Sequence, residues 1–470
     1  MLVASAKSES PLAERVLLAT QELKSALDHK VVTNPVVRAQ HANVTTYLPN
    51  EPADAVVFAE SVADVQQAVR ICAAHKVPVI PWGAGTSLEG QVNAPFGGVC
   101  IDLSRMNRIL AVNVEDLDCV IEPGVTRKRL NEDLRDQGLF FPIDPGADAS
   151  LGGMVSTRAS GTNAVRYGTM KDNVLSLDVV TPSGDLITTA TRARKSSAGY
   201  DLTRLYVGAE GTLGIVTAIT LKLYGIPEAI SAAVCPFPSI EAACNAVILT
   251  IQSGIPVARI ELLDEVQVRA SNAYAKLALA ETPTLFLEFH GTEASVHEQA
   301  DRFGAIAAEL GGGPSVFAVK PEERSKLWQA RHDAYWSALP LRPGAKAVAT
   351  DVCVPISRLA ACVMETKRDI EEMGLIAPIV GHVGDGNFHT TLMVDHDDPA
   401  DVEKAHLYMK RLVARALAMG GTCTGEHGIG QGKMGYMAAE HGEGALDVMR
   451  AIKRTLDPDD IMNPGKIVAI

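Results

Sequence analysis

Short apolar runs that alternate with helix-spaced segments characterise the first half of the chain. Residues 12–29 and 61–75 carry apolar side chains at helical spacing, and Ser61 is a favoured N-cap residue for the second helix. Its expected inner face is formed by Val65, Ala68, Val69 and Cys72. Another helix is expected at 127–137, ended by Gly138. Short apolar runs predict strands at 56–58, 77–81, 99–103, 119–122, 174–181, 186–189 and 215–223.

Beyond Pro227 the pattern changes, because strands alternate with longer amphipathic helices. These helices are expected at 239–252, 295–310, 358–373 and 444–456. That arrangement is typical of a separate α+β domain with an antiparallel sheet. A chain of 470 residues is also too long for one core. We therefore predict an α+β protein with four segments, which are 1–50, 51–227, 228–421 and 422–470.

Charge and cysteine usage restrict the function and the compartment. The net charge of −13 argues against nucleic-acid binding, which requires a basic surface. The eight cysteines form no C-x-x-C pair, which disfavours an iron–sulfur cluster and a zinc ribbon and fits reduced thiols in a cytoplasm. Residues 1–30 carry acidic side chains and lack the continuous apolar segment of a signal peptide. Neither a secretory signal nor an organellar transit peptide is therefore expected. The predicted location is cytoplasmic, with peripheral membrane contact left open.

Two histidines flank an Asp-Gly turn in the segment 376–394. Asp385-Gly386 lies between two apolar runs, and this dipeptide is a strong signal for a two-residue hairpin loop. In that register His382 faces His389, with Cβ atoms roughly 5 Å apart. Both rings can then reach one divalent metal ion. A cross-strand histidine pair without a metal is the simpler alternative.

A second segment, 420–430, supplies a third candidate ligand. It brackets Glu426 and His427 with glycines. Two histidines and one carboxylate leave coordination positions open, as in catalytic rather than structural metal sites. Zinc and manganese both suit such a ligand set. The pattern therefore favours a catalytic divalent metal site.

Three segments rich in small residues, 81–90, 145–163 and 207–217, lie within the first half. The first has the spacing G-x-G-x4-G, so it is neither a Rossmann turn nor a P-loop. Rows of small residues can still present backbone N–H groups to a pyrophosphate. Three such segments in one domain indicate a close approach of the backbone to one large ligand.

Together these segments resemble the FAD-binding domain of the vanillyl-alcohol-oxidase superfamily, and 456–466 resembles its flavin-contacting C-terminus. The histidine turn and residues 424–428 are similar to those of FAD-linked D-2-hydroxy-acid dehydrogenases. That group includes cytochrome-type D-lactate dehydrogenase, the flavin-binding component of glycolate oxidase, and D-2-hydroxyglutarate dehydrogenase. Segments 328–332 and 350–359 are most similar to the D-lactate branch. The resemblance covers about residues 50–470.

The resemblance implies a two-part FAD-binding domain of the PCMH type at 51–227, after an N-terminal helix and lead-in at 1–50. It further implies a substrate (cap) domain with the metal turn at 228–421, and a segment at 422–470 that returns to the flavin and the metal. The implied FAD contacts are Pro81, Gly83, Ala84, Gly85, Thr86, Ser87, Gly90, Pro145, Asp148, Gly152, Gly153, Ser156, Ala159, Gly161, Glu210, Gly214, Ile215 and Asn463. The first loop contains no histidine, which predicts non-covalent FAD.

Oxidation of a 2-hydroxy acid requires loss of the hydroxyl proton and transfer of the Cα hydrogen, most simply as hydride to flavin N5. A metal at the hydroxyl oxygen lowers its pKa. Our hypothesis assigns this metal to His382, His389 and Glu426. It assigns the role of general base to His427, because imidazole titrates near working pH. The resemblance implies the same four roles.

The substrate carboxylate requires a cation, and the resemblance implies Arg331 and Lys346. Tyr335 and Thr391 stand where D-2-hydroxyglutarate dehydrogenases carry threonine and asparagine. Aromatic bulk at position 335 would leave less room for a second carboxylate. The expected reaction is therefore oxidation of D-lactate, or of a similar D-2-hydroxy acid, to the 2-oxo acid.

Three alternatives stay open at this point. A glycolate oxidase subunit and a D-2-hydroxyglutarate dehydrogenase share the fold, whereas a metal-dependent hydrolase would use the metal ligands alone. The absence of a Rossmann fingerprint disfavours NAD, and no haem or iron–sulfur motif is present. Electrons are therefore expected to pass to an external acceptor, which could be a cytochrome, a quinone or an electron-transfer flavoprotein. A homodimer is the default oligomeric state.

Overall fold

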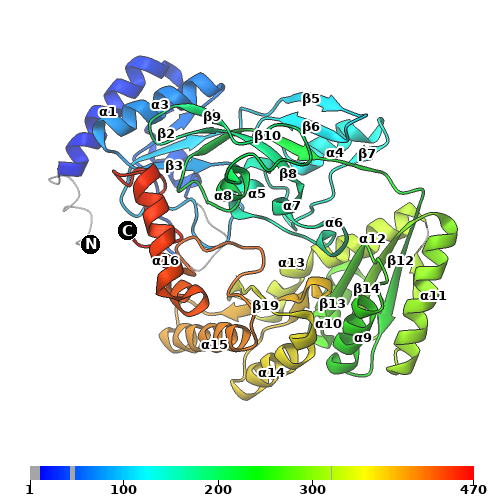
Figure 1. Ribbon diagram of the computed structural model, residues 1–470. Helices are drawn as coiled ribbons and strands as arrows, with labels where there is room; N and C mark the ends of the chain where they lie inside the picture. The colour runs from blue at the N-terminus through cyan, green and yellow to red at the C-terminus, as the bar shows by residue number, and fades with distance from the viewer. Residues whose placement is uncertain (1–10, 43–47, 319) are drawn as a thin grey trace.

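The computed structural model describes residues 11–42, 48–318 and 320–470 (Figure 1). The expectation that no transit peptide is present rests partly on residues 1–10, which lie outside this range. An upper body in Figure 1 contains the N-terminal sheets, and a lower body contains a long antiparallel sheet with its helices. The C-terminal helix lies back beside the upper body.

The first sheet of the upper body has the strand order β1-β2-β4-β3. Its strands are β1 (Val31–Val32), β2 (Ala55–Phe58), β3 (Val79–Trp82) and β4 (Val99–Asp102), and its helices are α1 (Pro11–Leu27), α2 (Pro35–Gln40) and α3 (Val62–His75). Strand β4 pairs in parallel with both β2 and β3. The Ser61 hydroxyl accepts a hydrogen bond from the Asp64 backbone N–H, so the predicted N-cap of α3 is confirmed. The four residues of the expected inner face are buried.

A five-stranded antiparallel sheet completes the upper body, with the order β5-β6-β10-β8-β9. Its strands are β5 (Ile109–Asn113), β6 (Asp118–Ile121), β8 (Val174–Val180), β9 (Leu186–Thr188) and β10 (Ile215–Lys222). The connecting helices are α4 (Arg127–Arg135), α5 (Leu151–Thr157), α6 (Ala164–Tyr167), α7 (Met170–Asn173) and α8 (Leu202–Tyr206). Two short strands, β7 (Leu139–Phe140) and β11 (Tyr224–Gly225), pair beside it.

The lower body is built on an eight-stranded antiparallel sheet, the cap sheet, with the order β15-β12-β14-β13-β18-β19-β16 and β17 paired with β19. Its strands are β12 (Ala229–Pro236), β13 (Arg259–Leu263), β14 (Thr284–Gly291), β15 (Val316–Ala318), β16 (Lys346–Ala349), β17 (Val352–Cys353), β18 (Ile379–Gly381) and β19 (Asn387–Val394). Its helices are α9 (Ile240–Gln252), α10 (Glu265–Ala275), α11 (Glu293–Glu309), α12 (Pro321–His332), α13 (Ala334–Ala338), α14 (Leu359–Glu372) and α15 (Pro399–Ala418). The antiparallel sheet predicted for this half is therefore present.

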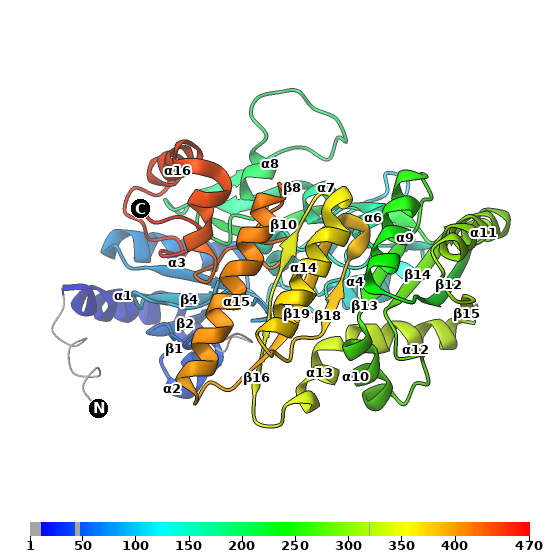
Figure 2. The ribbon, with the colours of Figure 1, turned by 90° about the horizontal axis from the view of Figure 1, so that it is seen from below.

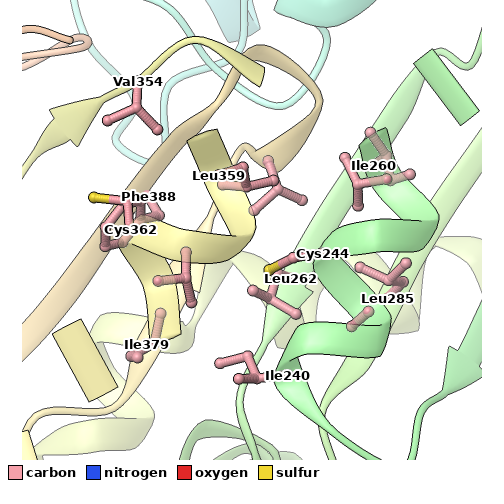
Figure 3. Packing of buried hydrophobic residues seen from close by; sticks show 14 of the residues in the cluster. Ile240, Cys244, Ile260, Leu262, Leu285, Val354, Leu359, Cys362, Ile379 and Phe388 are labelled. Carbon is pink, nitrogen blue, oxygen red and sulfur yellow. The ribbon is translucent and has the colours of Figure 1, made fainter. Parts of the chain in front are cut away.

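Helices cover both faces of the cap sheet. Helices α9, α11, α14 and α15 lie over one face (Figure 2), where their apolar side chains form one buried cluster with the strands. Figure 3 shows Cys244 of α9 beside Leu262 of β13, and Cys362 of α14 beside Phe388 of β19, within this cluster. Helices α10, α12 and α13 contribute to a smaller cluster with Leu263, on the opposite face. Neighbouring residues of β13 thus enter different clusters, as strand geometry requires.

The tail returns to the upper body. Helix α16 (Met437–Leu456) bends at Gly442. The segment after it pairs with β3, because the Val79 N–H donates to Ile461 O at 2.7 Å and the Asn463 N–H donates to Val79 O at 2.8 Å. The Asn463 amide also donates to Gln91 O and Glu210 O. The tail therefore lies beside the first and third glycine-rich segments.

Candidate active site

A cavity of about 500 Å³ lies where the two bodies and the tail meet. The upper body contributes residues from all three glycine-rich segments. The lower body contributes side chains from α12, α13, β18 and β19. Glu426, His427 and Asn463 complete the lining from the tail. Residues from distant parts of the sequence thus form one site.

Most of the expected FAD contacts line this cavity. They are Pro81, Gly83, Ala84, Gly85, Thr86, Ser87, Pro145, Gly152, Gly153, Ser156, Ala159, Glu210, Gly214, Ile215 and Asn463. Glycine is required at several of these positions for packing. A Cβ atom at Gly152 would lie 2.5 Å from Cβ of Pro123, and one at Gly211, where φ is +73°, would collide with the Pro81 ring.

Three expected FAD contacts do not line the cavity. Asp148 is exposed to solvent. Gly90 adopts a φ of +76°, and a Cβ atom there would lie 2.8 Å from the Leu48 side chain. Gly161 packs against the Asp144 backbone, 2.6 Å from where its Cβ would lie. Close packing next to the site is therefore enough to require glycine at both positions.

The histidine turn differs from the predicted two-residue loop. His389 is the register partner of Val380, not of His382, and Val383–Asp385 form a 3₁₀ turn. Gly386 has a positive φ of 80°, whereas Asp385 does not, so the turn is not of type I′. A longer turn is stabilised here because His382 leaves the strand pairing and contacts Glu261. The prediction of a directly opposed pair was wrong in register.

The three predicted metal ligands nevertheless converge. Nε2 of His382 lies 3.2 Å, and Nε2 of His389 lies 3.3 Å, from the same oxygen, Oε1 of Glu426. One ligand atom from each residue lies within 4.8 Å of the others. Metal–ligand bonds of about 2.0–2.2 Å are compatible with a cation between these atoms. The side chains therefore suit a divalent metal in position as well as in chemistry.

Both histidines are oriented through their second nitrogen. Nδ1 of His382 lies 2.8 Å from Oε1 of Glu261, and Nδ1 of His389 lies 3.0 Å from the Thr350 carbonyl oxygen. Such partners fix the ring and its tautomer, and they accompany most histidine metal ligands. Burial lowers the pKa of His382, but the carboxylates of Glu261 and Glu426 raise it well above its usual value. Glu261 was not predicted from the sequence.

The loop that carries Glu426 and His427 is held by Asp351. The Asp351 carboxylate accepts hydrogen bonds from the N–H groups of Glu426 and His427 and from the side chains of Thr424 and Asn387. Burial would raise its pKa, yet nearby cations, led by His427, hold the pKa well below the usual value. Asp351 also lies near His389 and His427. Since four donors already occupy its oxygens, we assign it to loop support rather than to the metal.

Buried polar atoms without a partner among the described residues mark where ligands fit. Oε2 of Glu426 and Nδ1 of His427 are two of them. The others that belong to the cavity lining are Nε1 of Trp82, Oγ of Ser87 and Oδ1 of Asn463. Buried polar groups normally have partners, so atoms of this kind that line the cavity are candidates for ligand contact. Oε2 of Glu426 fits a metal and the second set fits a polar cofactor, whereas Nδ1 of His427 lies on the side of Glu89, 3.9 Å from its Oε1.

The expected substrate-binding residues are only partly brought together. Arg331, Tyr335 and Thr391 line the cavity. Lys346 is exposed on β16 and does not line it, so the geometry does not support carboxylate binding by this lysine. The resemblance implied this lysine, but only the far end of β16, at Ala349, lines the cavity. His332 and Trp336 line the cavity as well and were not predicted.

Comparisons with known proteins agree with this arrangement. Residues 53–190 match the family described as "FAD binding domain", and residues 226–467 match "FAD linked oxidases, C-terminal domain". A protein of Danio rerio named "Probable D-lactate dehydrogenase, mitochondrial" is 51% identical over 94% of this chain and 90% of its own length. A protein of Arabidopsis thaliana named "D-lactate dehydrogenase [cytochrome], mitochondrial" is 48% identical over 95% of this chain and 79% of its own. The solved structure of p-cresol methylhydroxylase superposes with a TM-score of 0.79, at 19% identity and 97% coverage of both chains.

The solved structure confirms the predicted fold class, and the relatives correct the predicted location. Both relatives are named as mitochondrial, which overturns the expectation of a cytoplasmic protein. The cysteines cannot make this distinction. All eight are free in the structure, and reduced thiols fit a mitochondrial matrix as well as a cytoplasm. Among the described residues, no helix is both long and apolar enough to cross a bilayer.

Proposed function

The chain belongs to the FAD-linked oxidases, and we propose that it oxidises a D-2-hydroxy acid, with D-lactate as the preferred substrate. The convergence of His382, His389 and Glu426 beside His427, in the cavity lined by the glycine-rich segments, carries the proposal. Relatives named D-lactate dehydrogenase support it independently. A hydrolase that uses the metal ligands alone would leave the FAD-binding segments without a role.

Bound FAD would accept two electrons and the Cα hydrogen, and a divalent metal held by His382, His389 and Glu426 would act as a Lewis acid toward the substrate oxygens. The protein's own task is to remove the hydroxyl proton. His427 lines the cavity, and its ring stacks on His389 with the centroids 5.1 Å apart. Its Nδ1 is buried on the side of Glu89, whose Oε1 lies 3.9 Å away. We assign proton acceptance to the opposite nitrogen, Nε2.

Arg331 supplies the positive charge for the substrate carboxylate. It is buried in the cavity wall, where a guanidinium group binds a carboxylate strongly. Nε and Nη2 of Arg331 donate hydrogen bonds to the Glu261 carboxylate, which leaves Nη1 without a partner among the described residues. Tyr335 narrows the same region, with its ring against Trp336. This wall suits a small monocarboxylate better than a dicarboxylate.

Anaerobic reduction of the bound flavin tests the proposal directly. D-lactate should bleach the flavin absorbance near ~450 nm, and L-lactate should not, because the base and the cation address one face of Cα. Comparable bleaching by both isomers, or by neither, would contradict the substrate assignment. Faster reduction by glycolate or D-2-hydroxyglutarate than by D-lactate would favour those alternatives.

The state of the cofactors requires separate measurements. FAD is proposed to bind non-covalently, so acid denaturation should release all flavin into the supernatant, and colour in the pellet would contradict this. Metal analysis of the purified protein should find about one zinc or manganese per chain. Electrons are proposed to leave through an external acceptor, since the relative from Arabidopsis thaliana carries the word cytochrome in its name.

A further inference from the structure

Glu261 occupies a central position in the cap sheet. It lies on β13, between β14 and β18, and its side chain is completely buried. Its neighbours Ile260 and Leu262 enter the large apolar cluster on one face of the sheet, where Figure 3 shows both. Glu261 therefore points to the other face, toward α12 and the cavity. A carboxylate in this position is costly to bury unless it is fully paired.

The pairing joins two functional groups. Oε1 and Oε2 of Glu261 lie 2.8 and 2.9 Å from Nδ1 of His382. Oε2 also accepts hydrogen bonds from Nη2 and Nε of Arg331, at 2.5 and 2.9 Å. Burial opposes ionisation of Glu261, but His382 and Arg331 hold its pKa below the usual value. One carboxylate thus contacts both a proposed metal ligand and the proposed carboxylate-binding residue.

The neighbouring strand offers a contrast. Glu288 on β14 is likewise buried, and it pairs with His290 and Arg259 at 2.7 and 3.6 Å. None of these three residues lines the cavity. Two buried Glu–His–Arg groups are therefore centred on the cap sheet, and only the group around Glu261 contains residues that line the cavity. Stabilisation of the sheet alone would not require a connection to both functional residues.

We propose that Glu261 is a positioning residue that couples metal binding to binding of the substrate carboxylate. It holds His382 with Nε2 toward the metal, and it holds Arg331 with Nη1 toward the substrate. A metal that fixes His382 thereby fixes Glu261 and Arg331, and a bound carboxylate does the reverse. Such coupling is reciprocal by thermodynamic necessity. This inference rests on the proposed function.

The Glu261→Gln variant tests the coupling. The amide keeps the size but loses the charge, so it cannot accept from His382 and Arg331 together. We expect its Mn²⁺ affinity, measured by calorimetry on metal-stripped protein that retains FAD, to fall about 10–100-fold. KM for D-lactate should rise in parallel. In the wild type, added pyruvate, the 2-oxo product that carries the same carboxylate but cannot reduce FAD, should tighten Mn²⁺ binding, and in E261Q this effect should be lost.

Two further variants separate positioning from general stability. Glu288→Gln removes a matched buried charge from the same sheet and should leave the Mn²⁺ affinity and KM unchanged. Glu261→Asp retains the charge but shortens the side chain by one methylene. It should therefore fold even if E261Q does not, and it should also lose the dependence of Mn²⁺ affinity on pyruvate.

Several outcomes would overturn the inference. Wild-type Mn²⁺ affinity and KM in E261Q, or coupling that persists in E261D, would refute the role of Glu261 and leave the proposed function standing. Equal losses in E288Q would show a general effect of sheet stability. Wild-type protein that contains FAD but binds neither Mn²⁺ nor Zn²⁺ would instead refute the proposed metal site, and the coupling with it.

Discussion

Two walls of one cavity are built by different means. The wall from the upper body consists mainly of backbone and small side chains, such as Gly83, Gly152 and Gly211. The opposite wall carries ionisable side chains, among them Arg331, His382 and His427, each with a buried carboxylate nearby. The first wall can bind a large planar or phosphate-bearing group through its backbone, and the second can move a proton and hold charge.

The two walls should therefore respond to different kinds of substitution. Shape governs the small-residue wall, so additional atoms should damage it regardless of charge. Charge and hydrogen bonding govern the ionisable wall, so removal of single groups should damage it while leaving cofactor binding intact.

The largest effect is expected for His427→Ala. Loss of the proposed base should slow anaerobic flavin reduction by D-lactate about 10²–10⁴-fold. The FAD content should remain that of the wild type, because the small-residue wall is unchanged. Stopped-flow absorbance measures the rate, and His441→Ala, a histidine on α16 outside the cavity lining, serves as the control. Reduction within a few-fold of the wild-type rate would remove His427 from the mechanism.

Gly211→Ala tests the small-residue wall. At a φ of +73° and with Pro81 in contact, the added methyl group should lower the free energy of unfolding by about 1–3 kcal/mol. FAD occupancy should fall with it. Gly146→Ala is the matched control, since Gly146 also lines the cavity and a Cβ atom there meets nothing within 4 Å. Denaturant unfolding with flavin absorbance measures both quantities, and equal losses in the two variants would contradict the role of shape.

The sequence predicted the small-residue wall well for a physical reason. Close approach of a backbone requires small residues wherever it occurs, so the requirement is visible in each segment by itself. The same holds for Ser61, whose capping bond is local. At Gly90 and Gly161, which pack closely but do not line the cavity, the local signal is the same, so the sequence could not separate packing from contact with a ligand.

The ionisable wall was predictable only in part. His382 and His389 lie seven residues apart, so one turn is enough to bring them together. The predicted pairing register was wrong, because His389 pairs with Val380. Glu261 reaches His382 from 121 positions away through the pairing of β13 with β18, and nothing local marks it. Lys346 was expected from the resemblance alone, and it is exposed at the start of β16, outside the cavity lining.

A smaller effect, on specificity, is expected for Tyr335→Thr. Removal of the ring should admit a longer side chain, so the ratio of kcat/KM for D-2-hydroxyglutarate to that for D-lactate should rise about tenfold. Tyr335→Phe removes only the hydroxyl group, which lies 3.5 Å from Ala347 O, and should keep the ratio. Steady-state kinetics with both acids decide this. An unchanged ratio in Tyr335→Thr would show that other residues exclude the second carboxylate.

The smallest effect concerns Glu210, an ionisable residue on the small-residue wall. Burial raises its pKa to about 7, although the N–H groups of Ile429 and Gly430 donate to its oxygens at 2.7 and 2.8 Å. The folded protein therefore retains a proton that the unfolded chain loses near pH 4–5. The contribution of this proton to stability is complete below that range and is lost as the pH rises through about 7.

Glu210→Gln is uncharged at every pH and should remove this dependence. The difference in unfolding free energy, wild type minus E210Q, should therefore decrease between pH 5 and pH 8, by on the order of 1 kcal/mol. Urea unfolding at both pH values measures it. A difference that is constant or that increases with pH would mean that Glu210 is ionised throughout, because the two backbone donors outweigh burial. The small-residue wall would then carry a fixed negative charge, and the contrast between the two walls would be weaker than the structure indicates.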